Sequence, residues 1–528
     1  MNFTNQIESK IEAFKNKLST QQIYGFVAAL IAGIIAHGYV IFNRISYHDN
    51  TACLFNLGGT YESGRWMLGF VYDLQMKTTK LFSVPVFNGL LSIVFIAIAV
   101  MVLIDLFKIK SKLIATLIGA LMVVYPVVTS IFSFMFTSWE YQLALILAIL
   151  SAKILIEKRT IKNFCVASII FAVCLGFYQA FMSVTIAIFL ISLYFDVLED
   201  RFESVLDYIK TGLIYLANLG VGLALWAIIR KVTMTLKGIT AVDYKGMDEG
   251  FNLAQFPSLI IASIKAFFGF GQEGINAVLY QRAFTAVIVV IAIVQIVYLL
   301  IKKQTAVSIK FISILGLILL PIGMNVVYLL STSSEYNVDS VMLYGDIFIY
   351  ILPLMMIEKL EALEGISGFF AAAVGKLTWL QLALIIFMTI GYTYMDNAAY
   401  MKGEIAQEQA IAYFNQMITA IKTCDGFEDD MEIVLVGWSD LDDSTFTKVD
   451  STDQLEAVKI TKFPRYSDLV KYEGSIYFLR EHLGFGNDNV IIDDGTVAKE
   501  AAVKAMPTYP NDGAIAVVDG RVIVKLGE

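Results

Sequence analysis

The chain has 528 residues, of which 57% are hydrophobic and only 16% are charged, and its mean hydropathy is +0.69. Repeated apolar runs approach the roughly 20 residues that cross a bilayer as a helix, which excludes an ordinary soluble protein with one core. The formal net charge of -8 combines a near-neutral apolar part with an acidic tail, so nothing favours nucleic acid as a partner. The four cysteines show no spacing typical of a disulfide framework or a metal knuckle.

Residues 1–20 predict an amphipathic lead-in, because Ile7, Ile11, Phe14 and Leu18 recur at helical spacing among charged residues. No short apolar core followed by a small-residue cleavage site is present there. We therefore expect the first membrane span to be retained.

Hydropathy predicts about eleven spans in a transmembrane domain over residues 21–394. The expected spans are Tyr24–Phe42, Val84–Phe107, Leu113–Phe132, Tyr141–Ile156, Phe164–Phe177, Ala180–Tyr194, Leu213–Ile229, Phe284–Ile301, Phe311–Leu330, Val341–Ile357 and Leu377–Tyr394. The fifth and sixth share one apolar stretch over residues 164–197. That stretch is too long for a single helix rising about 1.5 Å per residue across a core of about 30 Å, so we predict a turn at Gly176–Gln179.

Lysine and arginine residues predict the orientation, since cytoplasmic loops are enriched in them. A cytoplasmic N-terminus puts most of the basic loop residues on one side of the membrane: Lys10, Lys15, Lys17, Lys108, Lys110, Lys112, Lys153, Lys158, Arg159, Lys162, Lys302, Lys303 and Lys310. The long loops Asn43–Ser83 and Arg230–Arg282 then face outward. Loops longer than about 15 residues are more often functional than not.

Residues 395–528 predict a C-terminal α/β domain outside the cell, because this tail is acidic and contains no apolar run of span length. Glu404–Ile421 has helical periodicity, and Glu432–Val436 reads as a buried strand. Ala514–Val518 and Arg521–Val524 predict a hairpin closed by an Asp-Gly turn.

Two acidic clusters in the tail, Asp429-Asp430 and Asp440–Ser444, suggest calcium as one interpretation. Neither cluster matches the twelve-residue loop with glycine at its sixth position that calcium sites commonly use. We favour solvated loops over a metal site at both positions.

The first outer loop brings an acid, a histidine and an arginine to the water boundary of the membrane. Asp49 follows the end of the first span closely, where partial desolvation raises the basicity of a carboxylate. It suits a general base that takes a proton from the hydroxyl of a sugar acceptor. The alternative is an interfacial aspartate that caps a helix near Thr51 and Ala52. For His48 an orienting or structural role is favoured over acid–base chemistry.

Arginines of the outer loops are candidates for binding a lipid phosphate, because the guanidinium fork holds two phosphate oxygens. Arg65 is the first choice, in a segment that also contains Glu62 and Trp66, and the Trp66 ring suits the membrane interface or a sugar face. Arg282 is the second choice. Arg230, with Lys231, is the third, and for this pair the interpretation as membrane anchors is favoured.

Two further polar groups lie at the predicted outer edge. Glu140 precedes the fourth span, and Tyr178-Gln179 occupies the turn between the fifth and sixth. Carboxylates and amides beside aromatic rings suit the recognition of sugar hydroxyls. Helix capping by Glu140 and turn packing by Tyr178 are equally compatible with the sequence.

The order of these features resembles the bacterial glucosyltransferase II family, polyprenyl-phosphate-sugar-dependent enzymes of the type C glycosyltransferase architecture. The resemblance covers residues 24–394 and rests on the Asp-bearing outer loop, Gly64-Arg65-Trp66, Tyr178-Gln179 and an arginine before a late span. It implies glucosyl transfer from an undecaprenyl phosphate donor to a surface glycan at the outer face of a bacterial cell membrane. Asp49 matches the catalytic acidic position of the family.

The resemblance also implies a departure at the second acidic position, because many members carry paired acids where this chain has Asp49-Asn50. The departure leaves Asp49 as the one strong base candidate, and a divalent metal is without support. We expect no other cofactor. The candidate catalytic residue is Asp49, and the candidate substrate-binding residues are His48, Asn50, Glu62, Arg65, Trp66, Glu140, Tyr178, Gln179 and Arg282.

Two other functions remain open from the sequence. A flippase for a lipid-linked sugar would bind the headgroup through Arg65 and Arg282 without making a bond, and it would show paired halves and broken helices. No internal repeat is visible, so an enzyme is favoured, with inversion of the anomeric centre by direct displacement. If the protein is a non-catalytic assembly factor, replacement of Asp49 should not change its function.

Overall fold

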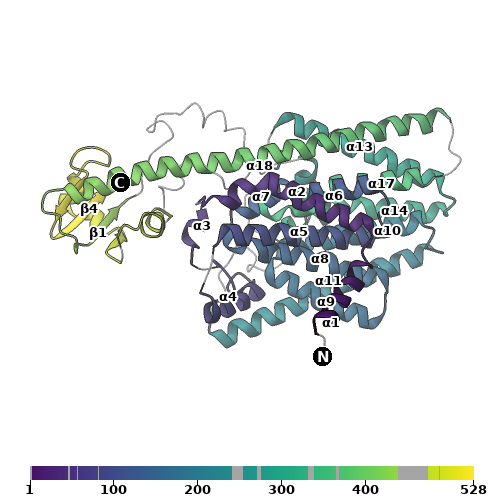
Figure 1. Cartoon of the computed structure of the whole chain (residues 1–528), viewed down its shortest axis with the longest axis horizontal. Coiled ribbons are helices and arrows are strands. Elements are labelled where there is room, and N and C mark those ends of the chain that lie inside the picture. Colours follow the sequence, from purple (N-terminus) through teal and green to yellow (C-terminus); the bar gives the residue numbers. More distant parts are fainter. Residues whose placement is uncertain are drawn as a thin grey trace.

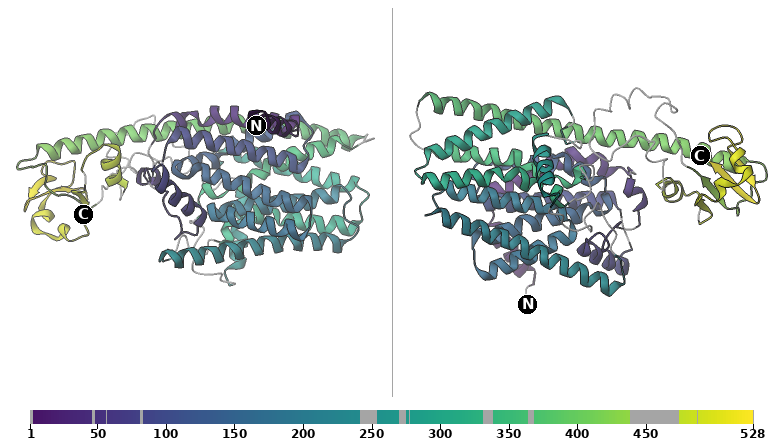
Figure 2. Two further views of the ribbon diagram at one scale, coloured as in Figure 1. Left: turned by 60° about the horizontal axis from the view of Figure 1, so that its bottom comes forward. Right: turned by 180° about the vertical axis from the view of Figure 1, so that it is seen from behind.

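The structure is a computed structural model of the chain. It describes residues 3–45, 48–55, 57–80, 83–240, 254–269, 275–276, 278–330, 338–363, 368–437, 474–486 and 488–527. A bundle of helices forms the larger part of the molecule, and a small sheet lies beyond one end of it in every view (Figures 1 and 2). The predicted combination of a helical membrane domain with a C-terminal α/β domain is confirmed.

The first helices pack through small residues. After α1 (Phe3–Lys15), α2 (Thr20–Phe42) begins with a capping box in which Ser19 and Gln22 bond each other's backbone N–H. It packs against α5 (Pro85–Phe107) and α6 (Lys112–Val124). The backbones of α2 and α6 meet at Gly25 and Gly119, as is typical of small residues at helix contacts in membranes.

The remaining helices of the bundle follow in chain order. They are α3 (His48–Ala52), α4 (Trp66–Thr78), α7 (Pro126–Phe132), η1 (Met135–Thr137), α8 (Ser138–Glu157), α9 (Ile161–Phe177), η2 (Gln179–Phe181), α10 (Met182–Leu198), α11 (Val205–Lys237), α12 (Phe256–Gly269), α13 (Leu279–Lys302), α14 (Val307–Ile318), α15 (Leu320–Met324), α16 (Val327–Leu330), η5 (Ser340–Met342), η6 (Tyr344–Ile347), α17 (Phe348–Glu361) and α18 (Phe369–Thr423).

Nine helical segments of the described chain are long and apolar enough to cross a membrane, compared with the predicted eleven. All of the predicted spans fall on helices. However, α9 has 17 residues and α17 has 14, so both stay below span length. The predicted turn at Gly176–Gln179 is confirmed, because α9 ends at Phe177 and Tyr178 is extended before η2.

Three predicted spans are broken into shorter helices, and one of them, Val341–Ile357, consists of η5, η6 and the first turns of α17. Tyr125 is extended between α6 and α7, because the residue before a proline disfavours the helical conformation, and Pro126 then opens α7. The predicted span Phe311–Leu330 consists of α14, α15 and α16. The apolar helix α12 was not expected within the loop Arg230–Arg282, which was predicted to face outward.

The long helix α18 connects the bundle to the small sheet (Figure 1). Its 55 residues correspond to roughly 80 Å at about 1.5 Å per residue, far more than the roughly 30 Å of a bilayer core. It runs through the predicted boundary at residues 394 and 395 without a break. From Ala406 onward, its buried side chains belong to the hydrophobic core of the C-terminal part.

The C-terminal sheet has four strands in the order β2-β1-β4-β3. Its strands are β1 (Ile433–Val436), β2 (Val490–Ile492), β3 (Ile515–Val518) and β4 (Arg521–Lys525), and the short helices of this part are α21 (Gly474–Tyr477), η8 (Phe478–His482), η9 (Val497–Lys499) and α22 (Ala501–Ala505). β1 is parallel to β2 and β4, whereas β3 and β4 form the predicted hairpin. Asp519 and Gly520 both have positive φ, as a two-residue hairpin turn requires.

The bundle has two chemically distinct ends. At one end, which we call the lysine-rich end, the last turn of α17 and the loops that follow α5, α10 and α13 meet through charged groups. The Lys110 N–H donates to the Glu358 carboxylate, Lys359 pairs with Glu199, and Lys303 pairs with Asp200. At the other end, which we call the α4 end, α3 and α4 lie on the side that faces the C-terminal sheet (Figure 1).

Candidate functional site

The loop that precedes α4 is held by side chains from two other parts of the bundle. Gln179 donates to the Ser63 carbonyl at 3.0 Å, the Trp226 indole to the Gly64 carbonyl at 2.9 Å, and Arg230 to the Glu62 carbonyl at 3.3 Å. Gly64 has φ +78°, and a Cβ there would lie 2.8 Å from the Trp226 ring. The position therefore requires glycine, both for its backbone conformation and for this close approach.

This anchored loop places the Arg65 guanidinium over two tyrosine rings. Its central carbon lies 5.9 Å from the Tyr141 ring centroid and 5.7 Å from that of Tyr178, within the range of cation–π attraction. The two rings stack with centroids 4.1 Å apart. The Tyr178 hydroxyl donates to the Val341 carbonyl at 3.2 Å. The structure thus brings Arg65, Tyr178 and Gln179 together.

Glu62 and Trp66 flank Arg65 and lie in different environments. Glu62 is half-buried, and its carboxylate accepts the Thr60 N–H at 2.8 Å, which stabilises the turn. Trp66 is 3% exposed and packs against Gly176, where a Cβ would come within 2.7 Å of the indole. The Trp66 indole N–H has no hydrogen-bond partner among the described residues.

Glu140 is fully buried in the first turn of α8, directly before Tyr141. Neither of its carboxylate oxygens has a hydrogen-bond partner within the described part of the chain. A buried carboxylate without partners is costly, and such groups concentrate at functional sites. Together with the Trp66 indole N–H, Glu140 offers both hydrogen-bond acceptors and a donor at the α4 end.

The helix α3 carries Asp49 close to the end of α2. Asp49 is half-buried, and its backbone carbonyl accepts the Cys53 N–H at 2.7 Å. Asn50 is 7% exposed and accepts a hydrogen bond from Ser83 at 3.0 Å, which ties α3 to the segment before α5. Burial, together with the charges of Asp49 and Glu481, raises the pKa of the Cys53 thiol to about 12.

Part of the predicted first-loop site lies outside the described residues. Ser46 and Tyr47 are not described, and of His48 only the backbone is, as the first residue of α3. The acidic cluster Asp440–Ser444 is likewise outside the described range. No group of three or more His, Cys, Asp or Glu residues suited to a metal ion occurs in the described segments.

Arg282 lies at the start of α13 and is exposed, and its Nε donates to the Asn276 carbonyl at 2.9 Å. Asn276 belongs to a buried network in which it accepts from Tyr392 at 2.6 Å, and the hydroxyls of Tyr392 and Tyr350 lie 2.6 Å apart. Arg282 therefore lies on α13 beside the network of Asn276, whereas Arg65 lies between α4, α8 and η2.

A continuous series of aromatic contacts connects the surroundings of Arg65 and Arg282. It runs through Tyr178, Phe181, Tyr344, Tyr125 and Tyr392, with ring centroids 5.5 to 6.1 Å apart at each step. Sequence reasoning missed Tyr125, Tyr344 and Tyr392, because aromatic residues within apolar runs have no distinct signature.

A buried carboxylate near this series was also missed. Asp346 is 7% exposed and accepts a hydrogen bond from Asn325 at 2.7 Å. It falls within the predicted span Val341–Ile357. A signal for it existed, because an ionisable residue within a membrane span is a functional candidate by default.

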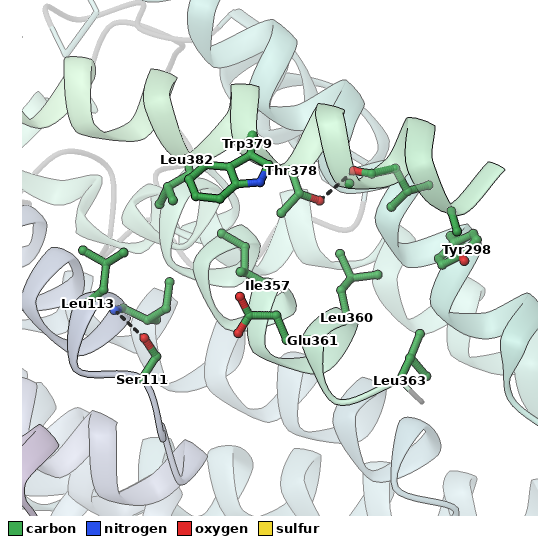
Figure 3. A pocket seen from close by; sticks show the side chains of 14 residues that line it. Ser111, Leu113, Tyr298, Ile357, Leu360, Glu361, Leu363, Thr378, Trp379 and Leu382 are labelled. Carbon is green, nitrogen blue, oxygen red and sulfur yellow. Dashed lines mark hydrogen bonds between the residues drawn. The ribbon is translucent and has the colours of Figure 1, made fainter. Parts of the chain in front are cut away.

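Two cavities of the described structure contain none of the predicted site residues. The first, about 430 Å³, lies at the lysine-rich end. Figure 3 shows Thr378 and Trp379 of α18 on one side of it and Ile357 and Glu361 of α17 on the other. The second, about 420 Å³, is an apolar groove between α10, α11 and the helices α14 to α16.

Comparison with known proteins identifies a family for this chain. Residues 38–354 match the family model described as glucosyl transferase GtrII. No curated protein and no solved structure matches the chain. The matched region covers more than half of the sequence and includes every predicted site residue from His48 to Arg282. The chain therefore belongs to the GtrII glucosyl transferase family, as the sequence resemblance predicted.

Proposed function

We propose that this protein transfers a glucosyl residue from a polyprenyl-phosphate donor to a cell-surface glycan at the outer face of a bacterial membrane. Family membership supports the glucosyl transfer. The lipid-linked donor and the site of reaction are supported by the position of Arg65, which is anchored at the same end of the bundle as Asp49. In this proposal the lysine-rich end faces the cytoplasm.

Asp49 is the general base of the proposed reaction. It takes the proton of the acceptor hydroxyl while the acceptor oxygen attacks the anomeric carbon of the donor. The bond between that carbon and the phosphate oxygen breaks, and the polyprenyl phosphate leaves with the bonding electrons. A single displacement of this kind inverts the anomeric centre. The half-buried position of Asp49 in α3 supports this role, because its carboxylate is not fully enclosed by the protein.

Arg65 stabilises the departing phosphate, which gains negative charge as the bond breaks. Its fixed position over Tyr141 and Tyr178 supports this role, because a preorganised cation needs no rearrangement during the reaction. The Glu140 carboxyl group and the Trp66 indole N–H are suited to hydrogen bonding with the sugar hydroxyls. Gln179 positions Arg65 through its bond to the Ser63 carbonyl.

A flippase for the same lipid is the second candidate, because the breaks between α6 and α7 and between α14 and α16 are a feature that a flippase would show. Transfer in detergent solution separates the two functions. An enzyme forms a new glycosidic bond there, whereas a flippase has no compartments to exchange lipid between.

The test compares the native protein with Asp49→Asn, both purified in detergent and supplied with undecaprenyl phosphate glucose and cell-surface glycan. We expect Asp49→Asn to lower the transfer rate by at least about 100-fold, the lower range for loss of a general base. Asp512→Asn, which removes an exposed charge of the C-terminal part, should retain the native rate. Full transfer by a normally folded Asp49→Asn protein would refute the assignment of Asp49.

A further inference from the structure

The apolar groove between α10, α11 and α14 to α16 is open to the surrounding membrane. It is lined almost entirely by apolar side chains, and Gly212, Gly316 and Gly323 also line it. Leu213, Leu216 and Leu319 line its margin and are 57%, 63% and 52% exposed. Because these residues lie on helices of membrane-span composition, the groove faces lipid chains. Its volume of about 420 Å³ falls within the range of about 300–1,000 Å³ typical of ligand pockets.

The groove continues toward the candidate site along one face of α11. Gly212, Leu216, Leu219, Leu223, Trp226 and Arg230 follow one another at spacings of three and four residues, which places them on one side of the helix. The first three line the groove or its margin. The last two bond the carbonyls of Gly64 and Glu62, on either side of Ser63 and directly before Arg65.

Packing contacts support the same continuity. Ile186, Leu219 and Val326 line the groove and also pack in one apolar cluster with Trp226. An amphiphile with its chain in the groove would therefore extend along apolar surface as far as Trp226. Its headgroup would then lie near two guanidinium groups, those of Arg230 and Arg65.

We propose that this groove binds isoprenoid units of the donor lipid that lie several units away from the phosphate, because Gly212 is roughly 27 Å from Arg230 along α11 at about 1.5 Å per residue. The inference rests on the proposed function and adds where the lipid chain binds. A single polyprenyl chain fits the observations, because the groove is one channel bordered by the rings of Phe189, Tyr208 and Tyr215 and leads to cationic groups that match a phosphate.

The test fills the groove at Gly212. A Cβ at this position would lie 3.8 Å from Leu193, an ordinary contact distance, so Gly212→Leu extends into the groove without a clash with the backbone. Gly220→Leu is the matched control: the residue lies on the same helix, is exposed, and a Cβ there would meet nothing within 4 Å. Transfer is measured with undecaprenyl phosphate glucose and with a donor that has only two isoprene units.

We expect Gly212→Leu to raise the KM for the long-chain donor by at least 10-fold and to leave kcat/KM for the short-chain donor within 2-fold of the native value. Gly220→Leu should match the native protein with both donors. If Gly212→Leu and the native protein have the same ratio of kcat/KM for the long-chain donor to kcat/KM for the short-chain donor, the groove assignment is wrong and the proposed function is unaffected. Absence of transfer by the native protein from either donor would instead overturn the proposed function.

A second measurement does not depend on folding of the variant. A polyprenyl phosphate with a diazirine several isoprene units away from its phosphate is photolysed with the native protein, and labelled peptides are identified. We expect label on residues 186–193, 209–219 or 316–326. Label confined to other helices, or equal labelling of these segments by a phospholipid diazirine probe, would overturn the assignment.

Discussion

Glu140 shows how a single buried ionisable side chain can separate function from stability. The residue is fully buried without a hydrogen-bond partner among the described residues, so ionisation of its carboxyl is unfavourable in the folded protein in the absence of substrate. Glutamine has nearly the same shape and cannot ionise. We therefore expect Glu140→Gln to leave the unfolding temperature unchanged or to raise it slightly.

The same substitution should lower glucosyl transfer by at least about 10-fold, because hydrogen bonds from sugar hydroxyls to a charged acceptor are stronger than those to an amide. Thermal unfolding and transfer are measured on the same preparation. Glu157→Gln is the control: it lies in the same helix at the lysine-rich end, is exposed and pairs with Lys153, so stability should change by less than about 0.5 kcal/mol. A fully active Glu140→Gln protein would show that the carboxylate is not used.

The sequence alone could predict candidate residues for the site but not how the loop before α4 is held. Arg65, Tyr178 and Gln179 became candidates because polar residues at predicted membrane edges are few. Trp226 was missed, and Arg230 was interpreted as a membrane anchor, because both lie more than 160 residues from the carbonyls that they bond. No local pattern within one sequence encodes such a contact.

At the scale of the helices, hydropathy located each span but not its ends or breaks. α11 is longer than its predicted span of Leu213–Ile229 because its polar last turns pack against the first loop, where Lys237 pairs with Asp73. The break at Tyr125 could have been predicted from the sequence, because a residue that directly precedes a proline disfavours the helical conformation. The break between α14 and α15 lies at Leu319, two residues before Pro321, which has no backbone N–H to continue the hydrogen bonds of α14.

The contact between α2 and α6 allows a test of helix packing. A Cβ on Gly119 would lie 2.2 Å from the Gly25 carbonyl oxygen, which belongs to the backbone and cannot rotate away. We expect Gly119→Ala to destabilise the protein by about 1–3 kcal/mol, the usual cost of overpacking, as measured by thermal unfolding in detergent.

Gly375→Ala is the control for this substitution. Gly375 lies within α18, and a Cβ there meets nothing within 4 Å. Alanine has the higher helix propensity, so this variant should be stabilised by up to about 1 kcal/mol. Equal stability of the two variants would contradict a close α2–α6 contact.

For the whole molecule, α18 determines where the C-terminal part lies. The helix continues from the bundle into the core of the sheet, and residues of α21 and η8 then contact α3, the helix that carries Asp49. Arg44, just after α2, donates to the Glu481 carbonyl at 3.4 Å. The sequence predicted the strand Glu432–Val436 and the hairpin correctly. It could not predict this contact, because the contact joins segments more than 430 residues apart.

The contact should depend on pH through His482. Burial and the positive charge of Arg44 lower the pKa of His482 from 6.5 to about 4, and its ring stacks on Phe478 with centroids 4.9 Å apart. A histidine with a lowered pKa must stay neutral in the folded state. Its contribution to stability is therefore complete above pH 6.5 and is lost progressively as the pH falls toward 4.

Hydrogen exchange of peptides that cover residues 474–486 measures this effect at pH 7.5, 5.5 and 4.5, after correction for the intrinsic exchange rate. We expect protection to decrease as the pH falls, and His482→Gln to remove most of the decrease. Glu481 acts in the opposite direction, because burial raises the pKa of its carboxyl and protonation then favours the folded state. Since the variant retains Glu481, the difference between the two proteins isolates His482. An equal pH dependence of protection in the native protein and in His482→Gln would show that this histidine is not buried against Arg44.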